Sequence, residues 1–314
     1  MIHIYPTYYQ KFKCIANKCP DSCCKGWDIV VDDETDAYYS TVKGEFGDKI
    51  RKLTTTDSDG DRIFVSQNGR CPFWNKDMLC DIYINIGEEH LCRTCQNFPR
   101  LTQDYTAFTE HLLSFACPEA SRLMLEEDNA YKDFTDVEYD FSDCDYDAEM
   151  MKILLEARKN TTEILADENY SFAENLSECL EYNQRIQNVF DGDETEIFSI
   201  ENKSDIQTIF NMHKEFDIMT DEWRELLDKT DISKGISSNY DAQFKRLALY
   251  YVYRYYLTAI DTMNVVSTIK RIACAYVVIG NLLQVTNCSV EKLFTLYSKE
   301  VEHSYENTES FSFG

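Results

Sequence analysis

The sequence predicts a mainly α-helical protein in which an irregular, cysteine-rich metal-binding module precedes an all-helical part. Nine of the 13 cysteines fall within the first 117 residues, and three of them are followed directly by proline. From residue 147 onward, apolar residues recur with helical spacing. An acidic stretch separates the two patterns. We therefore expect a cysteine-cluster module over 1–125, a connector over 126–146 and a helical domain over 147–314.

The N-terminal module is expected to hold only short regular elements. The sequence predicts β-like runs at 27–31 and 62–65, a helix over 33–51 and a turn at Asn68-Gly69. The Cys-Pro steps are typical of loops that are organised around something other than a large apolar core.

In the C-terminal part, helix starts are indicated at Ser171, Ser204 and Ser289, the first two with Glu or Gln three residues later. Six or seven helices are predicted. Their ranges are roughly 147–166, 172–190, 204–219, 221–229, 240–260, 265–284 and 289–305.

Charge and hydropathy restrict the classes of partner. The net charge is −25, which argues against a nucleic-acid surface of clustered Lys and Arg. Residues 126–149 contain eleven acidic side chains and one lysine, a pattern that predicts a solvated connector. The longest apolar run, 272–280, is far shorter than the roughly 20 residues that span a bilayer, and the first residues show no secretory signal pattern. We expect a soluble, cytoplasmic protein with neither nucleic-acid nor membrane partners.

The N-terminal cysteines have the spacing of metal ligands. They form the clusters Cys14-x4-Cys19-x3-Cys23-Cys24, Cys71-x8-Cys80, and Cys92-x2-Cys95 with Cys117 further on. Short loops let one turn supply two thiolates, and disulfides are rare in a reducing cytoplasm. One four-iron cluster with spare thiols or two zinc ions would satisfy the count. The alternative is a set of buried thiols, which we expect for the isolated Cys144, Cys179, Cys274 and Cys288. His90 and His111 could replace a thiolate but are expected to be structural.

Several motifs together carry a resemblance to a known family. They are Phe12-Lys13-Cys14, Cys19-Pro20-Asp21-Ser22-Cys23-Cys24-x-Gly26-Trp27, Gly69-Arg70-Cys71-Pro72-Phe73, Leu79-Cys80, Leu91-Cys92-x2-Cys95-x2-Phe98-Pro99-Arg100, Cys117-Pro118-Glu119-Ala120, Tyr250-Tyr251-x2-Arg254-Tyr255 and Tyr297-Ser298-Lys299-Glu300-Val301-Glu302-His303-Ser304. This pattern resembles the flagellin lysine-N-methylase (FliB) family, whose N-terminal half is similar to zinc- or iron-chelating cysteine-cluster domains. The resemblance covers most of the chain, although this chain looks shorter than typical members and is strongly acidic.

The resemblance implies a methyltransferase that moves methyl groups from S-adenosylmethionine to lysines of flagellin and depends on a [4Fe-4S] cluster. Its ligands would come from the nine N-terminal cysteines, among which the sequence does not select four. The sequence lacks the C-x3-C-x2-C triplet of radical S-adenosylmethionine enzymes. Two alternatives remain: a non-enzymatic zinc- or iron-binding module with a partner-binding helical domain, and an electron-transfer or redox-sensing iron-sulfur protein.

The methyl donor would need an unusual site, because no Gly-rich nucleotide loop is present. In the iron-sulfur interpretation the donor's amino and carboxylate groups could chelate an iron with an open position. Tyr250 and Tyr255 could stack on adenine or cage a cationic amine, and Arg254 could pair with a ligand's carboxylate. The alternative for this stretch is a buried amphipathic helix.

The last predicted helix carries candidate catalytic residues. Glu300, His303, Ser304 and Asn307 share one helix face, which would ordinarily be solvated. A lysine must lose a proton before its nitrogen attacks a methyl group. His303, beside Glu300 or Glu302, is predicted to accept that proton.

Overall fold

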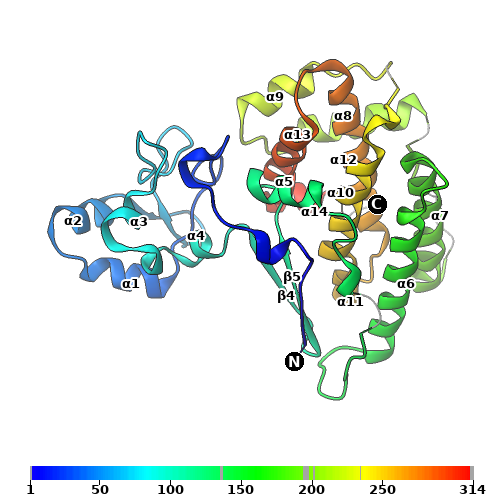
Figure 1. Cartoon of the computed structure of the whole chain (residues 1–314), viewed down its shortest axis with the longest axis horizontal. Helices are drawn as coiled ribbons and strands as arrows, with labels where there is room; N and C mark the ends of the chain where they lie inside the picture. The colour runs from blue at the N-terminus through cyan, green and yellow to red at the C-terminus, as the bar shows by residue number, and fades with distance from the viewer. Residues whose placement is uncertain (1, 135–136, 194–197, 201, 234, 312–314) are drawn as a thin grey trace.

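The computed structural model describes residues 2–134, 137–193, 198–200, 202–233 and 235–311, and it is mainly helical. Figure 1 shows a smaller lobe and a larger helical lobe, with the strands β4 and β5 beside the junction between them. The smaller lobe contains α1 (Asp33–Thr41), α2 (Gly44–Lys52), β2 (Thr54–Thr56), β3 (Arg62–Phe64), α3 (Asp81–Ile86) and α4 (Arg93–Asn97). The larger lobe contains β1 (Ile2–Ile4), β4 (Arg100–Asp104), β5 (Phe108–Leu113), α5 (Pro118–Glu126), α6 (Ala148–Ala166), α7 (Phe172–Asp191), α8 (Lys203–Glu215), α9 (Asp221–Asp228), α10 (Asp241–Tyr255), α11 (Ala259–Thr262), α12 (Val266–Val285), α13 (Val290–Tyr297), a π-helix (Ser298–Glu302) and α14 (Tyr305–Glu309).

The smaller lobe has its own apolar core. Its buried members are Ile29, Val31, Tyr39, Ile50, Phe64, Phe73, Ile82 and Cys92. The predicted helix over 33–51 is two helices, because Val42 is extended and Gly44 has a φ of +82°, a conformation that favours glycine. The run at 27–31 is not a strand and contributes one bridge, Val30 to Ile63, whereas 62–64 does form a strand. Asn68 and Gly69 both have positive φ, as the predicted turn requires.

The larger lobe is built around α12, which packs against α7, α10 and α13. This helix is long and apolar enough to cross a membrane, but 89% of its apolar window is buried inside the protein. Such burial is typical of a core helix and is consistent with a soluble protein. The strands β1, β5 and β4 form a small sheet, with β1 parallel and β4 antiparallel to β5.

Most C-terminal helices begin where the sequence predicted. Ser171 forms a capping box with Glu174, and Ser289 caps α13. The cap of α8 is Asn202 rather than Ser204. The predicted helix over 240–260 is interrupted after Tyr255, and the one over 289–305 changes into a π-helix after Tyr297.

The two apolar cores divide the chain differently from the predicted domains. Tyr8 and Phe115, within the predicted module 1–125, belong to the core of the larger lobe. The acidic segment contributes Tyr131 and Phe134 to the same core. The hydroxyl groups of Tyr8 and Tyr131 lie 2.9 Å apart. This segment therefore packs through its aromatic residues and is not a purely solvated connector.

A buried ion pair joins the sheet to the helices. The guanidinium of Arg158 on α6 donates two hydrogen bonds, of 2.7 and 2.8 Å, to the carboxylate of Glu110 on β5. The two side chains are 3% and 0% exposed. Because a buried charge without its partner is costly, this pair constrains how the sheet packs on α6.

We expect Arg158→Met to lower the free energy of unfolding by about 3–5 kcal/mol, because it leaves the Glu110 carboxylate buried and unpaired. Lys152→Ala is the control, since the Lys152–Glu149 pair is exposed and should contribute at most about 1 kcal/mol. Chemical denaturation of both variants measures the difference. Equal losses in the two variants would contradict this role for the pair.

Candidate functional site at the contact between the lobes

The structure brings N-terminal cysteines from separate loops together. The backbone N–H of Cys71 donates to the carbonyl of Cys24 at 2.8 Å, and Lys25 and Arg70 form a bridge beside them. The Cys24 thiol interacts with the thiols of both Cys23 and Cys71. Cys92 and Cys95 form a second interacting pair, at the start of α4. Pairing between the loops therefore gathers cysteines that lie far apart in the sequence.

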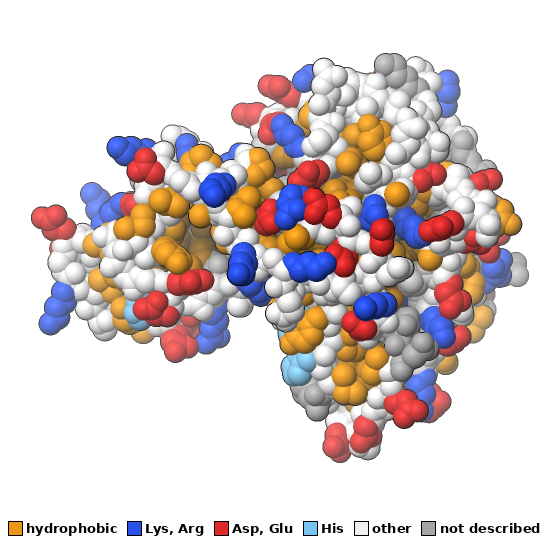
Figure 2. All heavy atoms as spheres, viewed as in Figure 1, with side chains coloured by type: hydrophobic (Ala, Val, Ile, Leu, Met, Phe, Trp, Pro, Cys, Tyr) orange, Lys and Arg blue, Asp and Glu red, His pale blue; other side chains and the backbone are white. Residues whose placement is uncertain are grey.

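The other members of the set lie within electrostatic range of these thiols. Cys95 interacts with Cys23 and Cys24, Cys80 interacts with Cys23, and Cys117 interacts with Cys19 and Cys23. Cys14 interacts with Cys19. Figure 2 shows a hollow in the smaller lobe that is bordered by side chains of the hydrophobic class, which includes cysteine in its colouring.

The predicted metal site is not formed by the described cysteines. Tetrahedral thiolates on zinc lie within about 4 Å of one another, given a Zn–S distance of about 2.3 Å. In the part of the chain that the structure describes, no three His, Cys, Asp or Glu side chains are arranged to hold a metal ion. A four-iron cluster attaches each thiolate to a different iron and so spreads its ligands further apart. Within the described residues the predicted metal site is therefore not formed, and the choice between a four-iron cluster and zinc stays a prediction.

The surroundings raise the pKa values of Cys23 and Cys95 and so favour their protonated forms. A hydrogen bond with Cys24, together with burial, raises the pKa of Cys23. The interaction with Cys92 and burial likewise raise the pKa of Cys95, while the same interaction lowers the pKa of Cys92. Binding of a metal group would require loss of these protons.

His303 lies where the larger lobe meets the cysteine-bearing segments. Its ring centroid is 5.0 Å from that of Trp27 and 6.2 Å from that of Phe98, and its Nε2 is 3.2 Å from the Oγ of Ser114. Trp27 follows Cys24 by three residues, Phe98 follows Cys95 by three, and Ser114 precedes Cys117 by three. Three separate cysteine-bearing segments therefore converge on this histidine.

Lys299, one turn before His303, makes the second contact between the lobes. Its ammonium group donates hydrogen bonds to the Asp21 carboxylate and to the carbonyl of Ser22, the latter at 3.1 Å. The same ammonium lies 5.2 Å from the centre of the Trp27 ring. The junction thus already accommodates a lysine ammonium between a carboxylate and an aromatic face.

The predicted polar face near the C-terminus is buried rather than solvated. Glu300 accepts hydrogen bonds from the backbone N–H of Met219, at 2.8 Å, and from the hydroxyl of Thr220, the cap of α9. Asn307 donates to the carbonyls of Glu300 and Asp217. Ser304 is 9% exposed and caps α14. The structure therefore assigns supporting contacts to Glu300, Ser304 and Asn307, and the prediction of a solvated face is wrong.

Glu302 is the centre of a buried network with α10. Its carboxylate accepts hydrogen bonds from Tyr250 and Tyr255 at 2.9 Å and from Tyr251 at 3.3 Å, and it forms an ion pair of 2.5 Å with Arg254. Neither Glu302 nor Glu300 makes a direct polar contact with His303 within the described residues. Glu302 acts on His303 only through its charge, so a catalytic role for either glutamate stays a prediction.

The surroundings of His303 keep its ring neutral. Desolvation by neighbouring groups and the positive charge of Arg254 lower its pKa to about 4, while Glu302 opposes the shift. The residue nevertheless retains an exposed surface. At neutral pH the imidazole is uncharged, so it can accept a hydrogen bond from a group that reaches the junction.

The predicted cofactor-binding residues separate into two groups. Arg254 finds its carboxylate partner in Glu302, so the prediction that it pairs with a ligand's carboxylate is wrong. Tyr250 is fully buried beside the same carboxylate and offers no ring face to a ligand. Tyr255 is partly exposed and borders a pocket of about 130 Å³.

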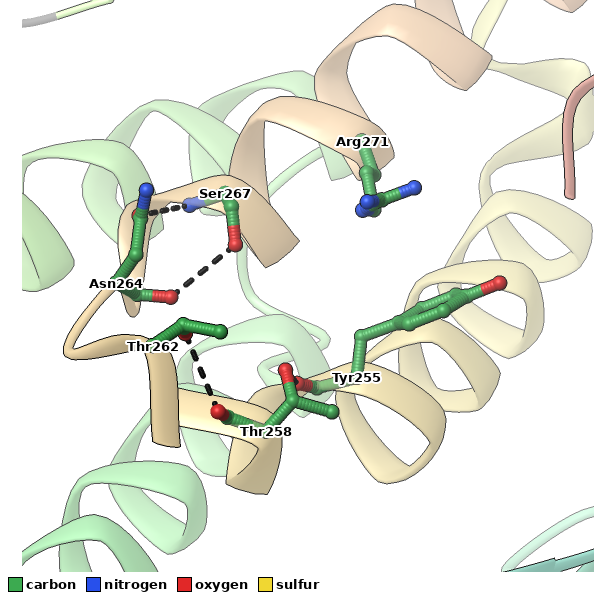
Figure 3. A pocket seen from close by; sticks show the side chains of 6 residues that line it. All are labelled: Tyr255, Thr258, Thr262, Asn264, Ser267 and Arg271. Atoms are coloured by element: carbon green, nitrogen blue, oxygen red, sulfur yellow. Dashed lines mark hydrogen bonds between the residues drawn. The ribbon is translucent and has the colours of Figure 1, made fainter. Parts of the chain in front are cut away.

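Figure 3 shows this pocket, which is lined by Tyr255, Thr258, Thr262, Asn264, Ser267 and Arg271. The sequence analysis missed Arg271 because it lies within an apolar helix that was predicted as core. Its adjacency to Lys270 in that helix is the one signal that could have identified it.

The remaining histidines make contacts away from the junction. His90 stacks on Tyr38 with ring centroids 4.0 Å apart. His111 lies on the sheet, where it stacks on Tyr5 and approaches His3 to 3.0 Å. Of the isolated cysteines, Cys179 and Cys274 are buried as expected, while Cys144 and Cys288 are partly exposed.

We expect the His303 imidazole to remain neutral from about pH 7.5 to about pH 5.5, because its pKa lies near 4. An unperturbed histidine would be about 90% protonated at the lower pH. Histidine side-chain NMR shifts, assigned with His303→Gln, measure this, with free histidine as the control. A midpoint at or above about 6.5 would contradict the proposed environment.

Comparison with known proteins places the chain beside bacterial flagellar proteins. It is 33% identical over 131 residues to the Lysine-N-methylase of Salmonella typhimurium and, over the same length, to the Flagellar biosynthetic protein FliU of Salmonella muenchen. The Lysine-N-methylase of Salmonella choleraesuis is 32% identical over 131 residues. Each alignment covers 40% of this chain. No family model and no solved structure matches.

The relatives differ in how much of their length is matched. The alignment spans 33% of each lysine-N-methylase and 78% of FliU. The chain therefore matches only about a third of the length of the lysine-N-methylases, but most of FliU. With 33% identity over 78% of FliU, the chain belongs to the FliU family, and it is similar over a shorter share to the lysine-N-methylases.

Proposed function

We propose that this protein is an S-adenosylmethionine-dependent protein-lysine N-methyltransferase that acts on flagellin and depends on an iron-sulfur cluster. Membership in the lysine-N-methylase family supports the reaction class. The structural observation that supports it most is the position of His303, on which three cysteine-bearing segments converge beside an accommodated lysine ammonium.

The cysteines would be the residues that hold the cluster. The candidates are Cys14, Cys19, Cys23, Cys24, Cys71, Cys80, Cys92, Cys95 and Cys117. A [4Fe-4S] cluster with one open iron position could bind the amino and carboxylate groups of the methyl donor. Trp27, Phe98 and His303 would then border the space that receives the acceptor lysine.

The transfer itself has a simple electron balance. The lone pair of the lysine nitrogen forms a bond to the donor's methyl carbon while the carbon–sulfur bond breaks. Its electron pair returns to sulfur, and S-adenosylhomocysteine leaves. The lysine must first lose its ammonium proton, for which neutral His303 is the candidate acceptor, and solvent at its exposed edge would then take the proton.

The surroundings of His303 suit an ammonium substrate. Phe98 lies beside His303, and the contact of Lys299 with the Trp27 ring is an example of an ammonium on an aromatic ring at this junction. The net charge of −25 would attract lysine-bearing segments and raise their rate of encounter.

Protein purified without oxygen should contain about four irons and four sulfides per chain, with a visible absorption band that S-adenosylmethionine perturbs. Cys24→Ala should reduce the iron content because the Cys24 thiol interacts with the thiols of both Cys23 and Cys71. Cys274→Ala is the matched control, since this thiol is buried in α12. Zinc without iron, and no response to the donor, would instead favour a non-enzymatic zinc-binding module.

His303→Ala should lower methyl transfer to a flagellin lysine by about 10²–10⁴-fold, the range typical of general acid–base catalysis. The variant should retain the iron content and the donor-induced spectral change. His90→Ala is the control, because His90 lies against Tyr38 in the smaller lobe. Full turnover by His303→Ala in a quantitative methylation assay would show that this histidine is not the proton acceptor.

A further inference from the structure

We propose that the pocket at the start of α12 is a binding site for a small oxyanion, a carboxylate or phosphate group, recognised by Arg271. The proposal goes beyond methyl transfer and does not depend on it. It rests on a buried guanidinium, on the residues around the pocket and on the pocket's size.

Arg271 differs from the other buried arginines of the larger lobe. Arg158 is paired with Glu110, and Arg254 is paired with Glu302. Arg271 is only 7% exposed, yet it forms no ion pair with any carboxylate in the described ranges. Because a buried charge requires a counter-charge, the exception points to a ligand that supplies one.

The contacts of Arg271 hold its guanidinium in place without neutralising it. It lies 4.8 Å from the Tyr255 ring and 4.7 Å from the Phe311 ring. One nitrogen donates to the carbonyl of Thr308 at 2.7 Å. A guanidinium has five N–H groups, so this bond leaves others for an oxyanion, which arginine binds in a bidentate manner.

The rest of the pocket is suited to a negative charge. Its lining consists of Tyr255, Thr258, Thr262, Asn264, Ser267 and Arg271, with no acidic side chain among these described residues. In Figure 3, Arg271 and the Tyr255 ring lie on one side of this space, Ser267, Asn264 and Thr262 lie on the other, and Thr258 lies beside Tyr255. The positive end of the α12 dipole, at Val266, adds to the attraction for an anion.

The threonine and serine hydroxyl groups of the lining donate to backbone carbonyls. Thr258, Thr262 and Ser267 each donate to a nearby carbonyl, at 2.6, 3.1 and 3.1 Å. Hydroxyl groups rotate readily and can exchange such bonds for a bound oxygen.

The pocket's volume limits the ligand to a group of few atoms. About 130 Å³ is less than the roughly 300–1,000 Å³ of a typical small-molecule pocket. A carboxylate or phosphate would fit, with the rest of a larger molecule outside. Tyr255 links the pocket to the candidate site, since its hydroxyl bonds to Glu302, the residue before His303.

Calorimetric titration of the full chain tests the proposal with two probes, inorganic phosphate and S-adenosylmethionine, and with adenosine as a donor fragment without a carboxylate. We expect at least one oxyanion to bind the wild-type protein and its affinity to fall tenfold or more in Arg271→Gln. Arg185→Gln, an exposed arginine on α7, should bind as the wild type does. Binding of phosphate alone identifies a phosphate group. Loss of S-adenosylmethionine binding with adenosine binding retained would place the donor's carboxylate at Arg271 instead of at the open iron position proposed above.

Ser267→Glu is a second variant that tests the proposal if Arg271→Gln does not fold. It places a carboxylate one turn before Arg271, where the two can pair, so it should fold, raise the melting temperature and abolish oxyanion binding. Absence of binding by either oxyanion to the wild type, or equal binding to Arg271→Gln, would overturn the proposal. Methylation activity does not enter these readouts, so failure of the proposed function is scored separately.

Discussion

The buried carboxylate of Glu302 holds the candidate site together. It lies at the end of the π-helix and is bound by three tyrosine hydroxyls and one guanidinium, all from α10. Since a buried carboxylate is stable only when its oxygens are satisfied, the network fixes the end of the π-helix against α10. His303 is the next residue in the chain. The position of His303 against Trp27 and Phe98 therefore depends on the contact between Glu302 and α10, although His303 itself takes no part in that contact.

The same contact separates the roles of two arginines. Arg254 and Arg271 lie on α10 and α12, at 4.9 and 4.8 Å from the Tyr255 ring. Glu302 neutralises Arg254. Arg271 contacts only a carbonyl oxygen and two aromatic rings among the described residues. The structure thus reverses the prediction from the tyrosine-rich motif. The conspicuous arginine is part of the scaffold, and the inconspicuous one in the apolar helix faces a pocket.

Local signals were enough to predict most helices, whereas the cysteines are gathered by pairing between loops far apart in the sequence. Ser171 and Glu174, for example, indicate a helix start from four consecutive residues. The errors occur where distant partners decide the outcome. The π-helix ends at a glutamate whose partners lie 47–52 residues earlier, and the ring contacts of His303 come from the first hundred residues. The acidic segment was misjudged because its aromatic residues, rather than its charges, determine its packing.

The contact between the lobes suggests how the state of the cysteines would reach the larger lobe. Lys299 and His303, which lie one helical turn apart, make these contacts from the larger lobe. Each of their partners lies within three residues of Cys23, Cys24, Cys95 or Cys117. A metal group that draws the thiols together would shift or order these loops, because metal binding is coupled to the folding of the segments that carry its ligands. The loops would pass that change directly to the turn that contains Glu302. Cluster binding and the placement of His303 are then two consequences of one packing arrangement.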